Sequence, residues 1–163
     1  MSEINPDDIQ QKLHSGKTIE EIIADFDWKE FESLVAEIFS ANGFFVKKNL
    51  RFKTNRRYEI DVLAVNKEVA FAVDCKEWGR GRYKTSGLRI STENQVMRAE
   101  NLKKFLKNNP IARKRLKIEN QEILPILVTW LQEDLQKHNN SLIIPVWKLN
   151  NFLLRAESFL STE

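Results

Sequence analysis

Three charged residues, Asp61, Asp74 and Lys76, interrupt two apolar segments of the chain, residues 58–65 and 69–76. A charge inside a buried strand is costly unless another group compensates it. Two carboxylates beside an amine form a group that can hold a divalent metal next to a reacting group. The pattern therefore indicates metal-assisted chemistry at the point where these two segments meet.

The short connection between the two segments predicts a β-hairpin. With a two-residue turn at 67–68, the register sets Asp61 opposite Asp74. Strand side chains alternate between faces, so Asp61, Asp74 and Lys76 are expected on one face. Opposed carboxylates repel, and one aspartate should stay protonated unless a cation compensates the pair. The same register sets Glu59 opposite Lys76, and that ion pair is an alternative explanation of the lysine.

The turn is the least certain element of this hairpin, because Lys67 and Glu68 are neither Gly nor Asn. A longer loop or a β-bulge would shift the register by one residue and move side chains to the other face. The sequence leaves this alternative open.

The composition predicts one folded domain in a reducing compartment. The chain has 163 residues, of which 42% are hydrophobic and 30% charged, and it has one cysteine. A single cysteine excludes an internal disulfide and fits the cytoplasm. The start of the chain is polar and acidic, unlike a signal peptide, and no apolar run approaches the ~20 residues of a membrane span. We therefore expect a cytoplasmic protein without a membrane partner.

Basic residues are clustered although the net charge is only +3. Such clusters fit the phosphates of a nucleic acid, and a solvated basic surface is the alternative. The clusters comprise Lys47, Lys48, Arg51, Lys53, Arg56 and Arg57; then Arg80, Arg82, Lys84 and Arg89; then Arg113, Lys114, Arg115 and Lys117. Trp78 precedes the second cluster and either stacks on a base or sugar or packs under its loop.

Two parts of the chain are expected: a helical N-terminal extension over residues 1–25 and a main domain over residues 26–163. Asp27 and Glu30 predict the capped start of a helix, and Asn42-Gly43 predicts its end. Apolar periodicity and turn residues predict the remaining elements. These are a strand at 44–50, the hairpin, a loop at 77–91, a helix at 92–108, strands at 123–130 and 142–147, and a helix from about 149. This order predicts an α/β fold, a mixed sheet flanked by helices.

This order, with Asp61 and Asp74-Cys75-Lys76 on adjacent strands, resembles the restriction-endonuclease-like fold of the PD-(D/E)xK nucleases. Ile60 stands where the family motif usually has proline. Glu32 lies on the helix that ends at Gly43-Phe44, and this feature is similar to archaeal Holliday-junction resolvases and Mrr-type enzymes. The resemblance covers roughly residues 28–109 and implies a three-layer sandwich.

The resemblance implies a metal-dependent endonuclease that hydrolyses phosphodiester bonds in DNA. It implies Mg²⁺, or Mn²⁺, as cofactor and Lys76 as the group that positions or deprotonates water. The implied metal ligands are Asp61, Asp74, Glu32 and the carbonyl of Cys75. Gln95 is a further catalytic candidate. The implied nucleic-acid contacts are Arg56, Arg57, Trp78, Arg80, Arg82 and Lys84. A homodimer is expected because many relatives cut two strands. The alternatives are a non-catalytic nucleic-acid-binding module on the same fold and an assembly subunit.

Overall fold

A computed structural model describes residues 11–12, 14–17, 21, 27–76, 85–129, 137–138 and 141–160. Most of the expected extension over residues 1–25 lies outside this range, and its boundary with the main domain stays a prediction. Trp78, Arg80, Arg82 and Lys84, four of the expected nucleic-acid contacts, also lie outside the described residues.

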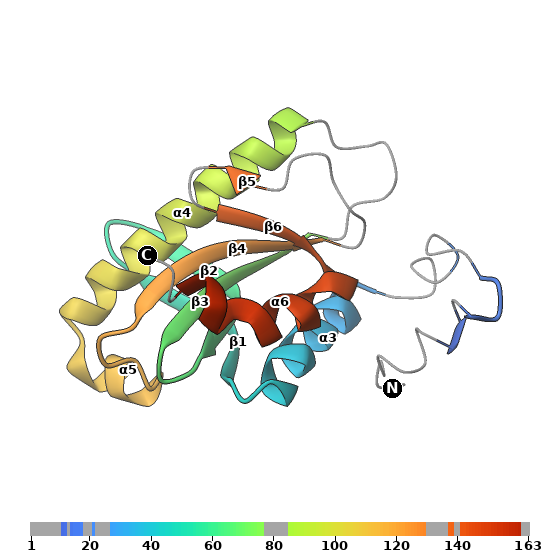
Figure 1. Ribbon diagram of the computed structural model, residues 1–163. Coiled ribbons are helices and arrows are strands. Elements are labelled where there is room, and N and C mark those ends of the chain that lie inside the picture. Colours follow the sequence, from blue (N-terminus) through green and yellow to red (C-terminus); the bar gives the residue numbers. More distant parts are fainter. Residues whose placement is uncertain are drawn as a thin grey trace.

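The described part of the chain contains a six-stranded mixed sheet with the order β1-β2-β3-β4-β6-β5 (Figure 1). The strands are β1 (Phe45–Lys53), β2 (Arg57–Val65), β3 (Val69–Lys76), β4 (Glu122–Thr129), β5 (Lys137–His138) and β6 (Ser141–Pro145). The first three strands form an antiparallel meander, whereas β3, β4 and β6 are parallel. The β3–β4 connection therefore has to cross the sheet, and α4 makes this crossing.

Helices cover both faces of the sheet, as the sequence predicts (Figure 1). The helices are α3 (Trp28–Ala41), α4 (Thr85–Lys107), α5 (Pro110–Arg115) and α6 (Val146–Leu160). One apolar cluster joins α3 and α6 to the sheet, and it includes Phe39, Phe71 and Leu149. A second cluster joins the other face to α4, and it includes Leu63 and Leu102. This helix–sheet–helix layering agrees with a restriction-endonuclease-like fold.

The ends of α3 follow from its predicted capping residues. The Glu30 N–H donates to Asp27 Oδ1 at 2.8 Å, and the Asp27 N–H donates to Glu30 Oε2 at 3.0 Å. This reciprocal pair satisfies N–H groups that an uncapped helix leaves without partners. At the other end, Gly43 has φ +86°, a left-handed conformation that glycine adopts without a Cβ clash. The capped helix holds Glu32 against the sheet.

In the β1–β2 hairpin, the alternation of side chains between the two faces of the sheet reverses at Asn49 and Asp61. We call this reversal the phase change of the hairpin. The regular β1–β2 pairing covers the residues on either side of these two but not the two themselves, and Asn49 has φ +53°. Ile60 packs in the α4-side cluster and Val62 in the α3-side cluster, although alternate residues of a regular strand share a face. The outer half of the hairpin thus packs toward α4, where Phe52 lies 5.5 Å from Phe105 between ring centroids.

The predicted loop at 77–91 and helix start at 92 are wrong for residues 85–91, which belong to α4. Gly87 favoured a loop because glycine destabilises a helix by about 1 kcal/mol. Leu88 packs with Leu127 and Ile143, and this burial stabilises the first turns of α4 against the cost of Gly87. No helix in the described part of the chain is long and apolar enough to span a bilayer.

Pro125 lies inside β4, opposite Ala72. Two further differences from the expected elements concern prolines. Pro110 begins α5, a helix that the sequence reading missed, because a proline at the first helical position lacks only an N–H that has no helical partner. Pro145 ends β6, so α6 begins at Val146, three residues earlier than expected.

Candidate functional site

The β2–β3 hairpin has the register that a two-residue turn predicts. Val62 faces Val73, and the Asn66 N–H donates to the Val69 carbonyl at 3.0 Å. The Asn66 side chain explains how the turn forms without glycine. Its Oδ1 accepts from the N–H groups of Glu68 and Val69, both at 2.9 Å. This register places the end of β3 beside Asp61.

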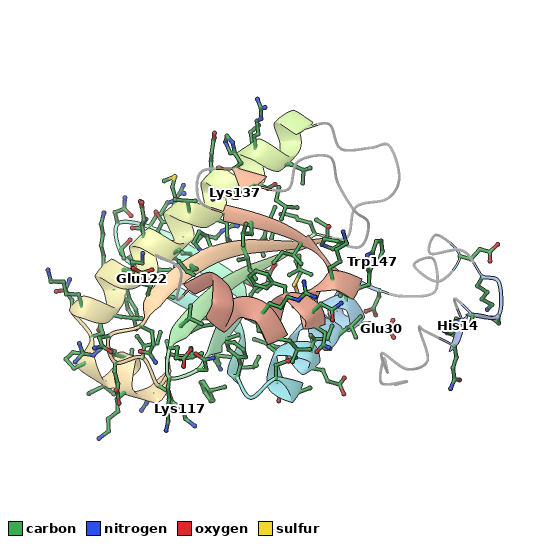
Figure 2. All side chains as sticks on the ribbon, in the orientation of Figure 1. His14, Glu30, Lys117, Glu122, Lys137 and Trp147 are labelled. Carbon is green, nitrogen blue, oxygen red and sulfur yellow. The ribbon has the colours of Figure 1, made fainter. Side chains whose placement is uncertain are left out.

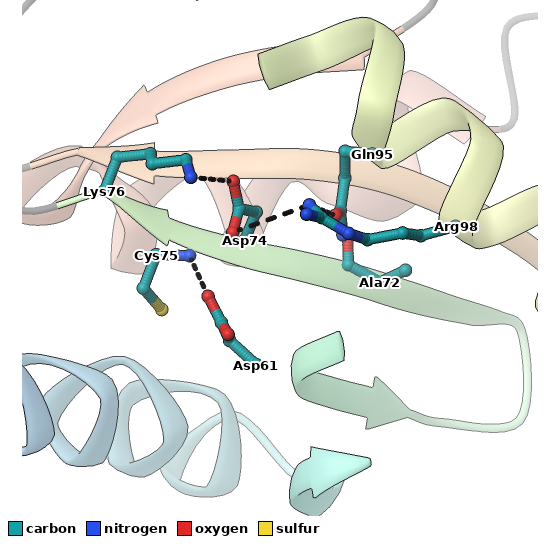
Figure 3. Close-up of polar contacts among 7 residues, drawn as sticks. All are labelled: Asp61, Ala72, Asp74, Cys75, Lys76, Gln95 and Arg98. Carbon is teal, nitrogen blue, oxygen red and sulfur yellow. Dashed lines mark hydrogen bonds and ion pairs between the residues drawn. The ribbon is translucent and has the colours of Figure 1, made fainter. Parts of the chain in front are cut away.

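Asp74 and Lys76 form the centre of the candidate site, on the α4 side of the sheet (Figure 3). Asp74 is buried, with 6% of its surface exposed, and Lys76 Nζ lies 3.1 Å from Asp74 Oδ2. Although this ion pair is close, Oδ2 accepts no hydrogen bond from the described residues. The Lys76 ammonium thus compensates the charge of Oδ2, and the hydrogen-bonding capacity of this buried oxygen stays open to a further ligand.

Asp61 is bonded to the backbone of β3 rather than to Lys76. Its Oδ2 accepts from the Cys75 N–H at 2.9 Å, just beyond the last regular β2–β3 pair (Figure 3). Asp74 and Lys76 therefore share one face of the sheet, as predicted. The prediction that Asp61 shares this face assumed regular side-chain alternation along β2, and this alternation is interrupted at Asp61.

The carboxyl group of Asp61 interacts with that of Asp74. Burial is the largest cause that raises the pKa of Asp61, to about 7, and the charge and hydrogen bonding of Asp74 raise it further. The Cys75 N–H opposes this shift, and the charge of Glu32 adds to it. Without a cation the pair thus favours a proton on Asp61 near neutral pH, as expected for adjacent buried carboxylates.

Glu32 is buried on α3, with 7% of its surface exposed, and its charge acts on both Asp61 and Cys75. The described residues nevertheless contain no group of three or more His, Cys, Asp or Glu side chains arranged to hold a metal. Asp61 and Asp74 are the predicted ligands that lie together. Glu32 is linked to them by electrostatics.

Cys75 is a packing residue, as its strand position predicts. Its side chain is fully buried in the α3-side cluster, and this burial is the main cause that raises the pKa of its thiol well above the usual range. A buried neutral thiol is a poor nucleophile and a poor metal ligand. A metal-binding role of Cys75 is therefore restricted to its backbone carbonyl.

Gln95 contacts β3 and is linked to Asp74 through Arg98 (Figure 3). Its side chain is fully buried, and Nε2 donates to the Ala72 carbonyl at 2.8 Å. Its Oε1 accepts from Arg98 Nη1 at 3.0 Å, and the same Arg98 atom lies 3.8 Å from Asp74 Oδ1. The sequence reading missed Arg98, although residues three apart on a helix lie on the same side.

The alternative explanation of Lys76, an ion pair with Glu59, is wrong. Glu59 Oε2 instead bonds Arg51 Nε at 3.3 Å across the β1–β2 pair, and Lys76 pairs with Asp74. Arg56 and Arg57, expected to contact nucleic acid, are exposed at the hairpin turn. The adjacent Thr54 bonds Asn101 of α4 at 2.9 Å, so these arginines lie beside α4 and outside the Asp74 cluster.

The third basic cluster lies at the other end of β3. Lys114 and Lys117 line a groove of about 1060 Å³ together with Asn66 of the β2–β3 turn. Figure 2 places Lys117 beside α5. Asp74 and Lys76, near the carboxyl end of β3, do not line this groove.

A mixed sheet flanked by helices, with an Asp and an Asp-x-Lys motif on adjacent strands, defines a restriction-endonuclease-like domain. Residues 27–145 match the model of the NERD family, described as "Nuclease-related domain". The chain belongs to this family, which is part of the restriction-endonuclease-like, or PD-(D/E)xK, superfamily.

The chain is also similar to an "Uncharacterized protein" of Archaeoglobus fulgidus, with 28% identity over 135 residues that cover 82% of this chain and 95% of the relative. Two crystal structures resemble it weakly. One is of a protein of unknown function, AF1548, with 17% identity, TM-score 0.41 and coverage of 74% of this chain and 51% of that chain. The other is VC1899 from Vibrio cholerae, with 14% identity, TM-score 0.42 and coverage of 82% of this chain and 34% of that chain. The match thus spans about half of the first and a third of the second.

Proposed function

We propose that this protein is a metal-dependent nuclease that hydrolyses phosphodiester bonds in DNA. The observation that carries the proposal is the buried Asp74 Oδ2 atom, which lies 3.1 Å from the Lys76 ammonium and accepts no hydrogen bond from the described residues. The carboxyl of Asp61 interacts with Asp74 by charge and hydrogen bonding. Membership of a nuclease-related family supports the same chemistry.

The residues present fit a hard divalent cation. Asp61 and Asp74 offer carboxylate oxygens, and Mg²⁺ usually takes one or two carboxylates together with waters and substrate phosphate. The Cys75 thiol is buried on the other face, so the donor set favours Mg²⁺ or Mn²⁺ over Zn²⁺. Glu32 and the Cys75 carbonyl complete the proposed set. When bound, the cation would supply Lewis-acid activation of water and stabilise charge on the phosphate.

The protein groups have separate roles in this proposal. The Asp61 carboxylate is held by the Cys75 N–H, which keeps one of its oxygens in a fixed place. Lys76 positions the attacking water and stabilises the negative charge that develops on the scissile phosphate. Asp74 holds the Lys76 ammonium close to the position proposed for the phosphate.

Contacts to the DNA backbone are proposed for exposed cations, which position a substrate without reading its sequence. Arg56 and Arg57 of the hairpin turn belong to this set. Trp78, Arg80, Arg82 and Lys84, which follow Lys76 in the chain, are proposed as further DNA contacts from the sequence alone. The likeness of the Glu32 region to Holliday-junction resolvases and Mrr-type enzymes supports branched or duplex DNA as substrate. A homodimer would supply one site for each strand.

Cleavage assays test the proposal directly. Branched, duplex and single-stranded DNA are incubated with the protein in Mg²⁺ or Mn²⁺, and Asp74→Asn and Lys76→Ala should abolish cleavage. Glu68→Gln and Lys67→Ala are matched controls, because they remove the same charges at the exposed hairpin turn and should retain cleavage. Cleavage that survives both site substitutions would exclude this site as its source.

A non-catalytic nucleic-acid-binding module is the second candidate. Two observations favour it: the described residues contain no cluster of three metal-binding side chains, and Asp74 already has Lys76 and Arg98 as neighbours. Calorimetry with Mn²⁺ separates the candidates. Tight DNA binding without Mn²⁺ binding would support the module and contradict the nuclease.

A further inference from the structure

Asp74 has a different cation at each carboxylate oxygen. Lys76 Nζ lies 3.1 Å from Oδ2, and Arg98 Nη1 lies 3.8 Å from Oδ1 (Figure 3). Lys76 is on the same strand as Asp74, whereas Arg98 comes from α4 on the layer above the sheet. The two oxygens of this carboxylate are therefore not equivalent.

Gln95 ties Arg98 to the backbone of β3. Its Nε2 donates to the carbonyl of Ala72, two residues before Asp74, and its Oε1 accepts from Arg98 at 3.0 Å. Both ends of this fully buried amide are thus used. Since the guanidinium is a rigid planar fork, fixing one of its nitrogen atoms also limits the positions of the others.

We propose that Arg98 is a positioning residue, which orients the Asp74 carboxylate so that Oδ2 faces the metal, and that Gln95 acts through Arg98. This inference rests on the proposed function. Arg98 lies on the Oδ1 side, whereas Oδ2 has Lys76 Nζ at 3.1 Å but no aligned hydrogen bond from the described residues, so this oxygen keeps a lone pair that can face the metal. Without Arg98 the carboxylate can rotate about its terminal torsion, whose energy wells are broad.

Two simpler roles of Arg98 make different predictions. A purely structural ion pair would contribute to stability and leave the turnover of folded protein unchanged. A contact to substrate phosphate would mainly change KM, and the 30% exposure of the side chain allows such a contact. A positioning role changes kcat, because it acts on geometry that matters in the transition state.

The experiment compares wild type, Arg98→Met, Asp74→Asn and Lys103→Met. Lys103 is exposed on the same helix, so its substitution removes one positive charge without a contact to Asp74. For Arg98→Met we expect kcat to fall about tenfold or more with KM within about twofold. Calorimetry should show weaker Mn²⁺ binding than in wild type, because Oδ2 is no longer held toward the metal. Lys103→Met should match wild type in all three quantities.

The role of Gln95 is tested by a double-mutant cycle. If Gln95 acts through Arg98, Gln95→Met should also lower kcat, and the double variant should be no slower than the slower single variant. Additive losses would show that Gln95 acts independently and would overturn that part of the proposal.

The outcomes distinguish this proposal from the proposed function. A wild type that neither cleaves DNA nor binds Mn²⁺ overturns both. If wild type cleaves and Asp74→Asn does not, an Arg98→Met variant with unchanged kcat overturns the positioning role alone, whatever its melting temperature. A rise in KM at unchanged kcat overturns it in favour of a substrate contact.

Discussion

The Asp61 carboxylate accepts a hydrogen bond from the Cys75 N–H at 2.9 Å, where the regular β2–β3 pairing ends. A side chain of one strand thus binds the backbone of the next, beside the buried Asp74. This arrangement follows from the phase change of the β1–β2 hairpin at Asp61 and Asn49. It places two carboxyl groups together at the cost of mutual repulsion.

This repulsion predicts a pH dependence of stability in a metal-free buffer. The folded-state pKa of Asp61 is about 7 against 3.8 for the free group, so the folded state binds the additional proton between these values. The free energy of folding gained from this tighter proton binding by Asp61 is complete below pH 3.8, and it is lost as the pH rises to about 7. Asp61→Asn, which keeps an acceptor for the Cys75 N–H, should remove this part of the dependence.

Urea denaturation with EDTA at pH 5 and pH 8 measures the effect. The wild type should lose more unfolding free energy between these pH values than Asp61→Asn does, and each unit of pKa shift corresponds to roughly 1.4 kcal/mol. Equal losses in the two proteins would contradict a raised pKa of Asp61.

The β2–β3 turn should depend on Asn66. Its Oδ1 accepts from two backbone N–H groups, those of Glu68 and Val69. Asn66→Ala removes this acceptor and should lower the unfolding free energy by about 1–2 kcal/mol. Lys67→Ala is the control, since Lys67 is exposed in the same turn. If Asn66→Ala and Lys67→Ala have equal thermal stabilities, the side chain does not hold the turn.

Local sequence patterns account for the parts of the fold that depend on neighbours along the chain. The capping box at Asp27, the helix end at Gly43 and the hairpin register each involve groups within a few residues. The pair Asp74–Lys76 could be predicted for the same reason, because strand alternation places residues two apart on one face.

Features that depend on tertiary contacts could not be predicted in this way. The Arg98–Asp74 contact joins residues on a strand and a helix, and the start of α4 depends on Leu88 packing against Leu127. The phase change at Asp61 requires a left-handed Asn49, which no local pattern marks, although asparagine is among the few non-glycine residues that adopt that conformation.

Asn49 supplies a test of the phase change itself. Its φ of +53° is easy for glycine and unfavourable for a β-branched residue. Asn49→Gly should therefore lower the unfolding free energy by no more than about 0.5–1 kcal/mol, the size of glycine's entropic cost. Asn49→Val should lower the unfolding free energy by roughly 1–2 kcal/mol. Since Asn49 is exposed, loss of burial would not explain the difference. Equal stabilities of the two variants would argue against a left-handed residue at this position.

The exposed cations Lys53 and Arg57, at the turn end of the β1–β2 hairpin, should affect DNA binding through phosphates. No described carboxylate pairs with Lys53 or Arg57, in contrast to Arg51, which bonds Glu59. Each phosphate contact releases counterions, so Lys53→Ala and Arg57→Ala should each reduce the slope of log affinity against log salt by about one. Lys137→Ala is the control, because Lys137 lies on β5 at the opposite edge of the sheet.

Fluorescence anisotropy at several salt concentrations measures the slopes. If the two hairpin variants keep the wild-type slope, this cluster is a solvated surface and DNA is bound elsewhere. If their slopes fall while kcat is unchanged, the hairpin positions the substrate and Asp61, Asp74 and Lys76 remain responsible for the chemistry.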